Sequence, residues 1–436
     1  MELKEILLVI RSFKENWYSF APLLGVIERN KILNNLQIFF LRDFRDLYSF
    51  QIKDIVEKSG KIIFAYSFFT TQAPLVLKEL EKILEYASQA GREKFVLVAG
   101  GSHPSGDFVG TLRMGFDVVV VGSGEVSFPK LIYNLQSNKP LSDVPGIVYS
   151  LDGKIARTEA QELHLDEFYG FSEKFDLFPP IEISRGCPHG CKYCEVPHIF
   201  GRKMIHRSIN VIRKHLEAYE KRFKNMEHID FRFISPNSLC YGSKDGKKAD
   251  PKSIEELLRT CNSFENSRTF FCTFPSEGRP ENFDEEIAGI ISEYCSNKNV
   301  AIGAQSGSSR ILKLMNRGHT IEDVYSAVDC ATNNCLGVSV DFLLGFPSET
   351  REDQYETYET IKHLLNKSEV RVRLHYFMPL PGTPLAYSKP APLDKEVLKA
   401  IYKLDKSGRI RGDLESQVKF SERNTRLLTE YKKNNR

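Results

Sequence analysis

The first part of the chain alternates short apolar or β-branched runs with stretches of helical spacing. Five candidate strands can be placed at Ile6–Ile10, Leu36–Leu41, Ile62–Phe68, Phe95–Ala99 and Phe116–Val121. Between the third and the fourth, Leu75–Ala90 carries apolar residues at helical spacing and ends at Gly91. Strands that alternate with helices predict an α/β domain of the Rossmann-like type, a doubly wound parallel sheet. Gly146–Ser150 and Lys154–Thr158, joined by Leu151-Asp152-Gly153, predict a β-hairpin that closes this domain.

The second part of the chain repeats strand and helix units. Six strands are expected at Ile181–Ser184, Ile229–Ile234, Thr269–Phe274, Val300–Ala304, Gly337–Leu344 and Val370–Phe377. A helical stretch follows each of them except the last. This pattern predicts a partial (β/α)6 barrel, whose chemistry would lie in the loops at the strand C-termini. The expected organisation is a first domain at 1–158, a linker at 159–180, the barrel at 181–385 and a short helical extension at 386–436.

Length and charge narrow the class of protein. A chain of 436 residues is too long for one core and suits two domains with an appendage. Lys and Arg number 60 and Asp and Glu 57, so the whole chain has no electrostatic signature of a nucleic-acid binder. Only residues 401–436 are basic, with ten Lys/Arg and five Asp/Glu, which fits a solvated helix face or contact with an anionic partner. The early apolar run Ile6–Ile10 is too short to span a membrane, so we expect a cytoplasmic protein.

The cysteines are unevenly distributed. Residues 1–186 contain none, and three of the nine lie at Cys187, Cys191 and Cys194. An odd number in a tight group indicates metal ligation in a reducing compartment and not disulfide formation. The three lie on a loop after a predicted strand, where Gly186 and Gly190 let the backbone wrap a compact cluster.

Three thiolates suit a four-iron cluster better than a structural metal ion. Three ligands on a cubane of four irons leave one iron open, and an open coordination position indicates catalysis. The alternative is a structural zinc site, for which His189 or His198 could supply a fourth ligand. The CxxxCxxC spacing, with Tyr193 before the last cysteine, favours the cluster.

With this motif the chain resembles the radical S-adenosylmethionine (SAM) superfamily. The resemblance implies an oxygen-sensitive [4Fe–4S] cluster on Cys187, Cys191 and Cys194, whose open iron chelates the methionine moiety of SAM. One electron, from a reductant such as ferredoxin or flavodoxin, would then cleave the sulfonium into methionine and a 5′-deoxyadenosyl radical that abstracts a substrate hydrogen.

Three later segments carry the same resemblance: Gly303–Ser308, Asp341–Thr350 and Phe377–Pro384. They look like the exits of the fourth, fifth and sixth barrel strands. The SAM contacts that the resemblance implies are Tyr193, Gln305, Ser306, Gly345, Phe377 and Met378. Gln305 departs from the glutamate that often stands there. Arg279 is a candidate partner for the methionine carboxylate, because a guanidinium binds a carboxylate through two parallel hydrogen bonds; a surface ion pair is the alternative.

The first domain has glycine-rich strand exits of the kind that admit a cofactor. GGxHP at Gly100–Pro104, GxGE at Gly122–Glu125 and the segment Tyr66–Gln72 resemble the cobalamin (B12)-binding domain of a bacterial and archaeal group of class B methylase-like radical SAM proteins. The implied cobalamin contacts are Ser67, Thr70, Gly100, Gly101, His103, Gly122, Ser123, Gly124 and Glu125. The DxHxxG cobalt-ligand motif is absent, which leaves His103 as a lower ligand or, by preference, a turn cap.

The leading functional hypothesis is therefore a cobalamin-dependent radical SAM methyltransferase that methylates an unactivated carbon through methylcobalamin. The alternatives are a cobalamin-associated radical cyclase or rearrangement enzyme and a non-catalytic cobalamin sensor or Fe–S module. A methylthiotransferase is disfavoured, because that family needs three more cysteines in its first domain. The other six cysteines are expected to pack in the core. They are Cys240, Cys261, Cys272, Cys295, Cys330 and Cys335.

Overall fold

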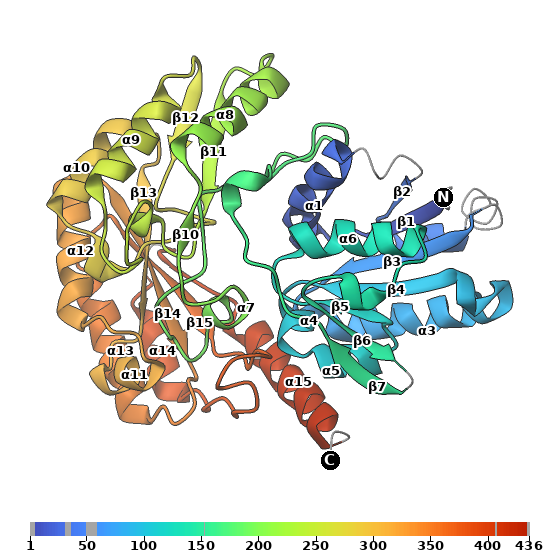
Figure 1. Ribbon diagram of the computed structural model, residues 1–436. Helices are drawn as coiled ribbons and strands as arrows, with labels where there is room; N and C mark the ends of the chain where they lie inside the picture. The colour runs from blue at the N-terminus through green and yellow to red at the C-terminus, as the bar shows by residue number, and fades with distance from the viewer. Residues whose placement is uncertain (1–4, 31–35, 49–58, 152, 406–407, 434–436) are drawn as a thin grey trace. The chain divides into compact units, whose positions relative to one another are not determined.

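The computed structural model describes residues 5–30, 36–48, 59–151, 153–405 and 408–433 (Figure 1). The chain divides into two compact units, Met1–Pro179 and Pro180–Arg436. The segment expected as a linker packs within the first unit, where Phe171 and Leu177 are buried. Asp152, in the expected hairpin turn, lies outside the described residues.

The first unit contains one seven-stranded sheet with the order β2-β1-β3-β4-β5-β6-β7. The first five strands are parallel, and the last two add an antiparallel hairpin. The strands are β1 (Ile6–Arg11), β2 (Leu36–Leu41), β3 (Lys61–Ser67), β4 (Phe95–Gly100), β5 (Val118–Val120), β6 (Ile147–Leu151) and β7 (Lys154–Arg157). The α-helices include α1 (Trp17–Arg29), α3 (Ala73–Ala90), α4 (Ser102–Gly106), α5 (Phe108–Arg113) and α6 (Gly124–Gln136). The predicted doubly wound parallel sheet is confirmed.

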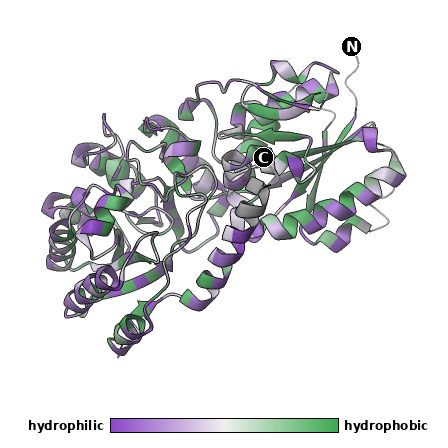
Figure 2. Cartoon of the chain, turned by 90° about the horizontal axis from the view of Figure 1, so that it is seen from below, coloured by the Kyte–Doolittle hydropathy of each residue, from purple (hydrophilic) through white to green (hydrophobic). Residues whose placement is uncertain are grey.

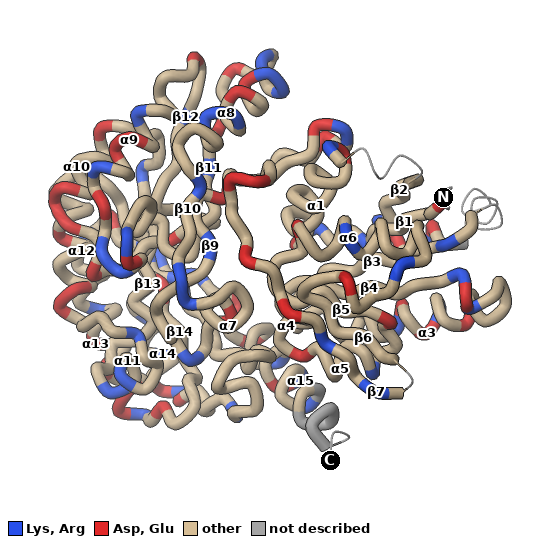
Figure 3. Tube along the Cα trace, viewed as in Figure 1, with Lys and Arg blue, Asp and Glu red and all other residues tan. Residues whose placement is uncertain are grey.

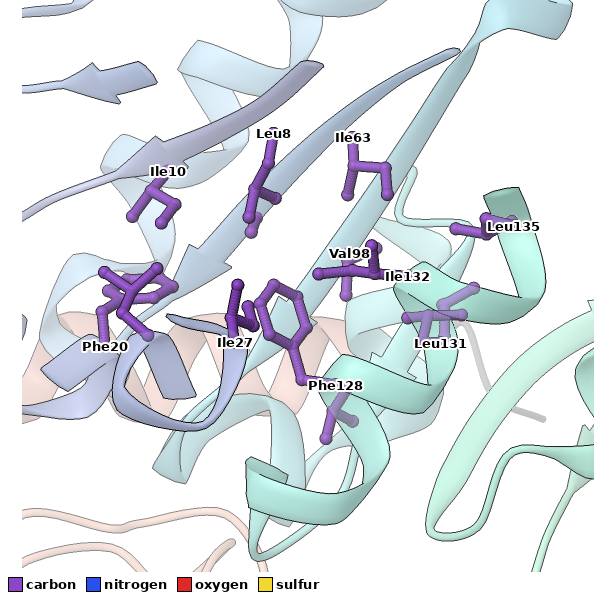
Figure 4. Close-up of a cluster of buried hydrophobic side chains, with 14 of the residues drawn as sticks. Leu8, Ile10, Phe20, Ile27, Ile63, Val98, Phe128, Leu131, Ile132 and Leu135 are labelled. Atoms are coloured by element: carbon purple, nitrogen blue, oxygen red, sulfur yellow. The ribbon is translucent and has the colours of Figure 1, made fainter. Parts of the chain in front are cut away.

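Helices cover both faces of this sheet, which explains why its parallel strands are apolar on both sides. On one face, α1 and α6 bury a cluster against β1, β3 and β4 (Figure 4). Phe20 of α1 and Phe128 of α6 belong to it, with Leu8 of β1. Side chains alternate along a strand, so Arg11 of β1 points to the other face. There it pairs with Glu79 of α3, which places α3 on that face.

The second unit is built from parallel strands in two sheets, with the orders β12-β11-β8 and β13-β14-β15-β16. The strands are β8 (Ile181–Glu182), β11 (Ile229–Ile234), β12 (Ser267–Phe270), β13 (Asn299–Gln305), β14 (Gly337–Leu344), β15 (Val370–Tyr376) and β16 (Ile410–Arg411), with a small antiparallel pair of β9 (Ser184–Arg185) and β10 (Ile205–His206). The α-helices are α7 (Val196–Ile199), α8 (Ile209–Phe223), α9 (Pro251–Asn262), α10 (Glu285–Tyr294), α11 (Ser309–Met315), α12 (Ile321–Asn333), α13 (Arg351–Leu364), α14 (Lys395–Lys403) and α15 (Leu414–Lys433).

Hydrogen bonds join the two sheets through the segment after β12. Ala301 N donates to Cys272 O at 2.7 Å, and Gly278 N donates to Ala301 O at 2.9 Å. Gly303 N in turn donates to Gly278 O at 3.2 Å. The strands therefore form one curved wall with helices outside it, and the predicted partial barrel is confirmed (Figure 1).

Two elements differ from the expectation. The third barrel strand ends at Phe270 and not at Phe274, because Cys272 adopts a left-handed backbone conformation with φ 52°. The extension after the barrel was expected to be mostly helical, but it also adds β16, which pairs in parallel with β15. A strand of two residues is too short to show a period of two in the sequence.

The surface fits the near-neutral composition. Apolar residues follow the strands, and the helices alternate polar and apolar positions (Figure 2). Basic and acidic residues are interspersed along both units (Figure 3). No helix among the described residues is long and apolar enough to cross a membrane. For the basic segment 401–436, side chains near its end lie outside the description.

Candidate active site

The cysteine loop follows β9 and is fixed by backbone contacts at both ends. Gly186 has φ +80°, and a Cβ there would lie 2.2 Å from Lys203 O, so only glycine fits this close approach. Cys187 N donates to Gly201 O at 3.1 Å. Lys192 N donates to Met315 O at 3.0 Å, which ties the loop to the end of α11.

The three cysteines carry free thiols on this loop, and Cys191 is buried. Burial raises the pKa of Cys187 and raises that of Cys194 to about 12. These thiols therefore remain protonated at neutral pH until a metal takes the place of their protons. No group of three or more His, Cys, Asp or Glu side chains among the described residues converges on a single-ion position. A four-iron cluster takes each thiolate on a different iron.

Two buried arginines point at Cys191. Arg279, in the loop after β12, is 4% exposed, and its Nη1 donates to Cys191 Sγ at 3.6 Å. Arg317, after α11, is 8% exposed, and its Nη1 donates to the same sulfur at 3.8 Å. Arg279 Nη2 also donates to Arg317 O, which interlocks the two loops. Hydrogen bonds from charged donors to sulfur favour the thiolate, so this pair fits an anionic cluster.

The groups around the two arginines leave an excess of positive charge. Arg279 Nε donates to Glu281 Oε1 at 2.5 Å, and the two form an ion pair. His319 Nδ1 lies 3.7 Å from Glu281 Oε2, but burial and the guanidinium groups of Arg317 and Arg279 lower the pKa of His319 to about 2. With His319 neutral, two arginines face one carboxylate. The donor set and this charge together fit a [4Fe–4S] cluster held by Cys187, Cys191 and Cys194.

Tyr193 packs on an apolar wall formed by the ends of β14 and β15 and by α11. Its ring contacts a cluster that contains Phe346 and Phe377, whose ring centroids are 5.7 Å apart. Burial raises the pKa of Tyr193. Tyr193 follows the first barrel strand and Phe377 follows the sixth, and both were predicted to contact SAM. The structure brings these two residues together in one apolar cluster. Met378 follows Phe377 and is partly buried.

The exit of β13 holds the next two predicted SAM residues. Gln305 has φ +71° at a register shift between Gly303 and Gln305. Arg317 Nη2 donates to Gly303 O at 2.8 Å, and a Cβ at Gly303 would lie 2.6 Å from Gln305 Nε2 and 2.9 Å from Arg317 Nη2, so both side chains pack against this glycine. Ser306 is fully buried, and its hydroxyl lies 3.4 Å from Thr357 Oγ1 of α13. The structure thus turns Ser306 toward a helix, and its role as a SAM contact stays a prediction.

The exit of β14 presents Gly345. Its φ is +75°, and a Cβ there would lie 2.1 Å from the ring of Tyr376. Gly345 N donates to Glu349 Oε2 at 2.6 Å, and Gly345 O accepts from Ala391 N at 2.9 Å. The backbone of this exit is therefore held from both sides.

The residues predicted to contact cobalamin lie at the ends of β3, β4 and β5 and at the start of α6, so they share the C-terminal edge of the first sheet. They are Ser67, Thr70, Gly100, Gly101, His103, Gly122, Ser123, Gly124 and Glu125. Gly101 has φ +95°, and a Cβ there would lie 2.8 Å from Ser67 Oγ. Gly122 N donates to Ser105 Oγ at 2.9 Å. Gly101 thus lets the exits of β3 and β4 approach closely, and the roles of these residues as cobalamin contacts stay a prediction.

His103 is fully buried on this edge. Its Nδ1 lies 3.1 Å from Thr70 Oγ1, and its ring lies 5.3 Å from that of Phe68. Its Nε2 has no hydrogen-bond partner among the described residues, and burial lowers the pKa of His103 to about 4. Asn16 Oδ1 is a second buried polar atom on this edge without a partner, while Asn16 Nδ2 donates to Ser67 O at 2.5 Å. Unpartnered polar atoms at a strand exit fit a polar cofactor.

Arg317 and Glu349 are residues of the site that sequence reasoning did not assign. Glu349 lies inside the segment Asp341–Thr350, whereas Arg317 follows Met315-Asn316, nine residues beyond the segment Gly303–Ser308. A charged residue within an otherwise apolar and glycine-rich motif was the available signal. Its meaning depended on burial, which the sequence does not give.

Comparison with known proteins identifies the class. Residues 181–361 match the Radical SAM superfamily. Residues 181–361 therefore form a radical SAM domain, and the chain is an enzyme with a [4Fe–4S] cluster and SAM as the cofactors of its barrel.

Solved structures share the fold of nearly the whole chain. The radical SAM methyltransferase TsrM from Kitasatospora setae, with cobalamin and a [4Fe–4S] cluster bound, has a TM-score of 0.65 at 15% identity and covers 88% of this chain and 74% of its own. The cobalamin-dependent SAM radical enzyme OxsB, with aqua-cobalamin bound, has a TM-score of 0.66 at 16% identity and covers 93% and 56%. The predicted two-part fold class is confirmed by both.

Curated relatives match less of their own length. The tRNA-2-methylthio-N(6)-dimethylallyladenosine synthase of Thermotoga petrophila is 29% identical over 246 residues, 55% of this chain and 52% of that protein. An uncharacterised methyltransferase from Pyrococcus horikoshii is 27% identical over 292 residues, 62% and 59%. The chain therefore spans somewhat more than half the length of these two curated relatives.

Proposed function

We propose that the chain is a cobalamin-dependent radical SAM methyltransferase that methylates an unactivated carbon. The observation that carries the proposal is the composite fold: TsrM and OxsB, which share it over 88% and 93% of this chain, are both described with cobalamin bound. The glycine-lined edge of the first sheet, with unpartnered atoms at His103 and Asn16, supports a cofactor there.

The residues of the barrel account for the binding steps. When bound, the cluster with SAM supplies a 5′-deoxyadenosyl radical, and cobalamin supplies the methyl group. Cys187, Cys191 and Cys194 would hold the cluster. Tyr193 and Phe377 form an apolar wall beside the cysteine loop, which would exclude water from the adenine side of SAM. An electron donor is required by the class, and a ferredoxin or flavodoxin is the donor that we propose.

The role of Arg279 in binding the methionine carboxylate is limited by its existing ion pair. The sequence made it a candidate for the methionine carboxylate, or else a surface ion pair. It is buried and already paired with Glu281 at 2.5 Å, so it is no surface pair. Binding of a carboxylate by Arg279 would have to share the guanidinium with Glu281, and this role stays a prediction.

The curated relatives raise sulfur insertion as a second candidate. The relative from Thermotoga petrophila is a tRNA-2-methylthio-N(6)-dimethylallyladenosine synthase. Family resemblance assigns three further cysteines to the first domain of such enzymes, and this sequence has none before Cys187. The absence of those ligands favours methylation over methylthiolation.

Product analysis under anaerobic conditions tests the proposal. The chain is reconstituted with iron, sulfide and hydroxocobalamin, reduced with dithionite, and given SAM; Cys191→Ala is the matched control without an intact cluster site. Methylation predicts bound cobalamin together with both 5′-deoxyadenosine and S-adenosylhomocysteine in the wild type. Deoxyadenosine without S-adenosylhomocysteine would instead support a cyclase or rearrangement enzyme. The absence of both products would support the sensor or Fe–S module.

A further inference from the structure

The buried positive charge beside Cys191 belongs mainly to one residue. Arg279 has a carboxylate partner, Glu281, at 2.5 Å. Arg317 has no carboxylate within 4 Å among the described residues, and its Nε is buried without a hydrogen-bond partner. Its remaining contacts are Gly303 O at 2.8 Å and Cys191 Sγ at 3.8 Å. A buried charge without an anionic partner is costly, so the folded chain needs an anion at this position.

The sulfur of Cys191 lies 3.8 Å from Arg317 Nη1 and can become anionic. A guanidinium is not deprotonated in proteins, so Arg317 carries a full positive charge at this position. A thiolate at Cys191 would supply the missing negative charge. Hydrogen bonds to cluster sulfurs, net charge and solvent exposure are the factors that set the reduction potential of an iron–sulfur cluster.

We propose that Arg317 is a positioning residue for the [4Fe–4S] cluster, whose guanidinium acts as counter-charge to the Cys191 thiolate and raises the reduction potential of the cluster. This rests on the assignment of the barrel to the radical SAM class and is independent of cobalamin. Reduction adds one electron from the donor, taking the cluster core from 2+ to 1+, with no bond made or broken. The added negative charge is what a fixed, buried cation stabilises.

The backbone explains how Arg317 reaches this position. Helix α11 ends at Met315, and Asn316 follows in the left-handed conformation with φ 56°. Arg317 N donates to Leu312 O at 3.0 Å, and Arg317 O accepts from Arg279. The same turn receives Lys192 N from the cysteine loop at Met315 O. The turn after α11 therefore carries both the cation and an anchor of the loop that bears Cys191.

Potentiometric titration with dithionite, followed by electron paramagnetic resonance of the reduced cluster, tests the proposal on the full chain without cobalamin or substrate. Arg317→Gln is expected to lower the ratio of reduced to oxidised cluster at a fixed potential about tenfold. For a one-electron couple this corresponds to a reduction potential that is lower by about 59 mV. Arg279→Gln is expected to change it less, because Glu281 already balances that charge. Lys313→Gln removes a charge from the exposed side of the same helix and should leave the potential unchanged.

Two results would overturn the assignment. One is a potential for Arg317→Gln equal to that of Lys313→Gln. The other is an unchanged potential with weaker binding of SAM, which would assign the charge of Arg317 to the methionine carboxylate. The titration contains no substrate, so its result does not depend on whether the chain is a methyltransferase. A chain that fails to methylate would contradict the proposed function and leave the role of Arg317 unaffected.

A measurement on the wild type covers the case in which Arg317→Gln does not retain a cluster. Protein labelled with ¹⁵N at the arginine side chains should show weak ¹⁵N hyperfine coupling in pulsed resonance of the reduced cluster. The coupling should decrease in Arg317→Lys, which keeps the charge but removes the labelled group. A wild-type spectrum without such coupling would contradict the proposal.

Discussion

Glu349 is a buried acid without a basic partner. It is 6% exposed, its Oε2 accepts from Gly345 N and from Gln354 Nε2, and its Oε1 has no partner among the described residues. Burial raises the pKa of Glu349 to about 7, against an ordinary value of 4.5. The neutral acid is thus the form that the fold tolerates.

The pH dependence follows from this shift. Because the folded pKa lies above the unfolded one, the contribution of Glu349 to stability is complete below about pH 4.5 and is lost as pH rises through about 7. The free energy of unfolding of Glu349→Gln, relative to that of the wild type, should therefore increase from pH 5 to pH 8.5, by at most about 3 kcal/mol. Urea unfolding of the cluster-free protein at both pH values measures the difference.

The matched control is Glu356→Gln, an exposed acid on α13. It should give the same difference from the wild type at both pH values. If Glu349→Gln also behaves in this way, the carboxyl group of Glu349 is ionised in the folded chain and the argument from burial is wrong.

Single residues also show the limits of sequence reasoning. Cys187, Cys191 and Cys194 could be assigned from spacing alone, because their chemistry is local to one loop. Arg317 could not, because its importance arises from contacts with Gly303 and Cys191 that are distant in sequence. Burial and the lack of a carboxylate partner are properties of the folded chain only.

At the scale of elements, α15 completes the hydrogen bonding at the end of β15. Gln417 Oε1 accepts from Tyr376 N at 2.8 Å, and Ser421 Oγ donates to Phe377 O at 2.7 Å. Both contacts fall where β15 leaves the sheet and the predicted SAM wall begins. The helix therefore fixes the backbone that carries Phe377.

Gln417→Ala should leave Tyr376 N–H without its acceptor and destabilise the barrel by about 1–3 kcal/mol. Chemical unfolding measures the loss, and hydrogen exchange of the Tyr376 amide locates it. Glu415→Ala is the control on the same helix, since its ion pair with Lys419 is exposed and should contribute little. Equal stability of the two variants would show that α15 does not support β15.

The elements that could be predicted are the long apolar ones. The bounds expected for β2, β11 and β14 are those observed, because apolar residues occupy at least every second position of each strand. The split of the first barrel strand into β8 and β9 was not foreseen, and neither was β16. Such short strands are defined by their pairing partners, which a single sequence does not reveal.

At the scale of the whole molecule, the two cofactor sites belong to separate units with separate cores. If the proposed function is right, each site should load without the other. Replacing all three of Cys187, Cys191 and Cys194 by alanine should abolish the cluster absorbance and leave the cobalamin stoichiometry unchanged. Iron, sulfide and cobalt analyses of the anaerobically reconstituted chain measure both.

The reciprocal variant is Gly101→Val. Its side chain would meet Ser67 and Phe68 at a position with φ +95°, so cobalamin should be lost while the cluster is retained. Loss of both cofactors in either variant would contradict independent loading.

The barrel is open, and its wall ends on strands of only two residues, β8 at one side and β16 at the other. A long unpaired strand at the border of a sheet recruits strands from other molecules and starts aggregation. Borders this short offer almost no template for such recruitment. We therefore expect protein that has lost its iron to oxygen to stay dispersed, in a state from which it can be reloaded.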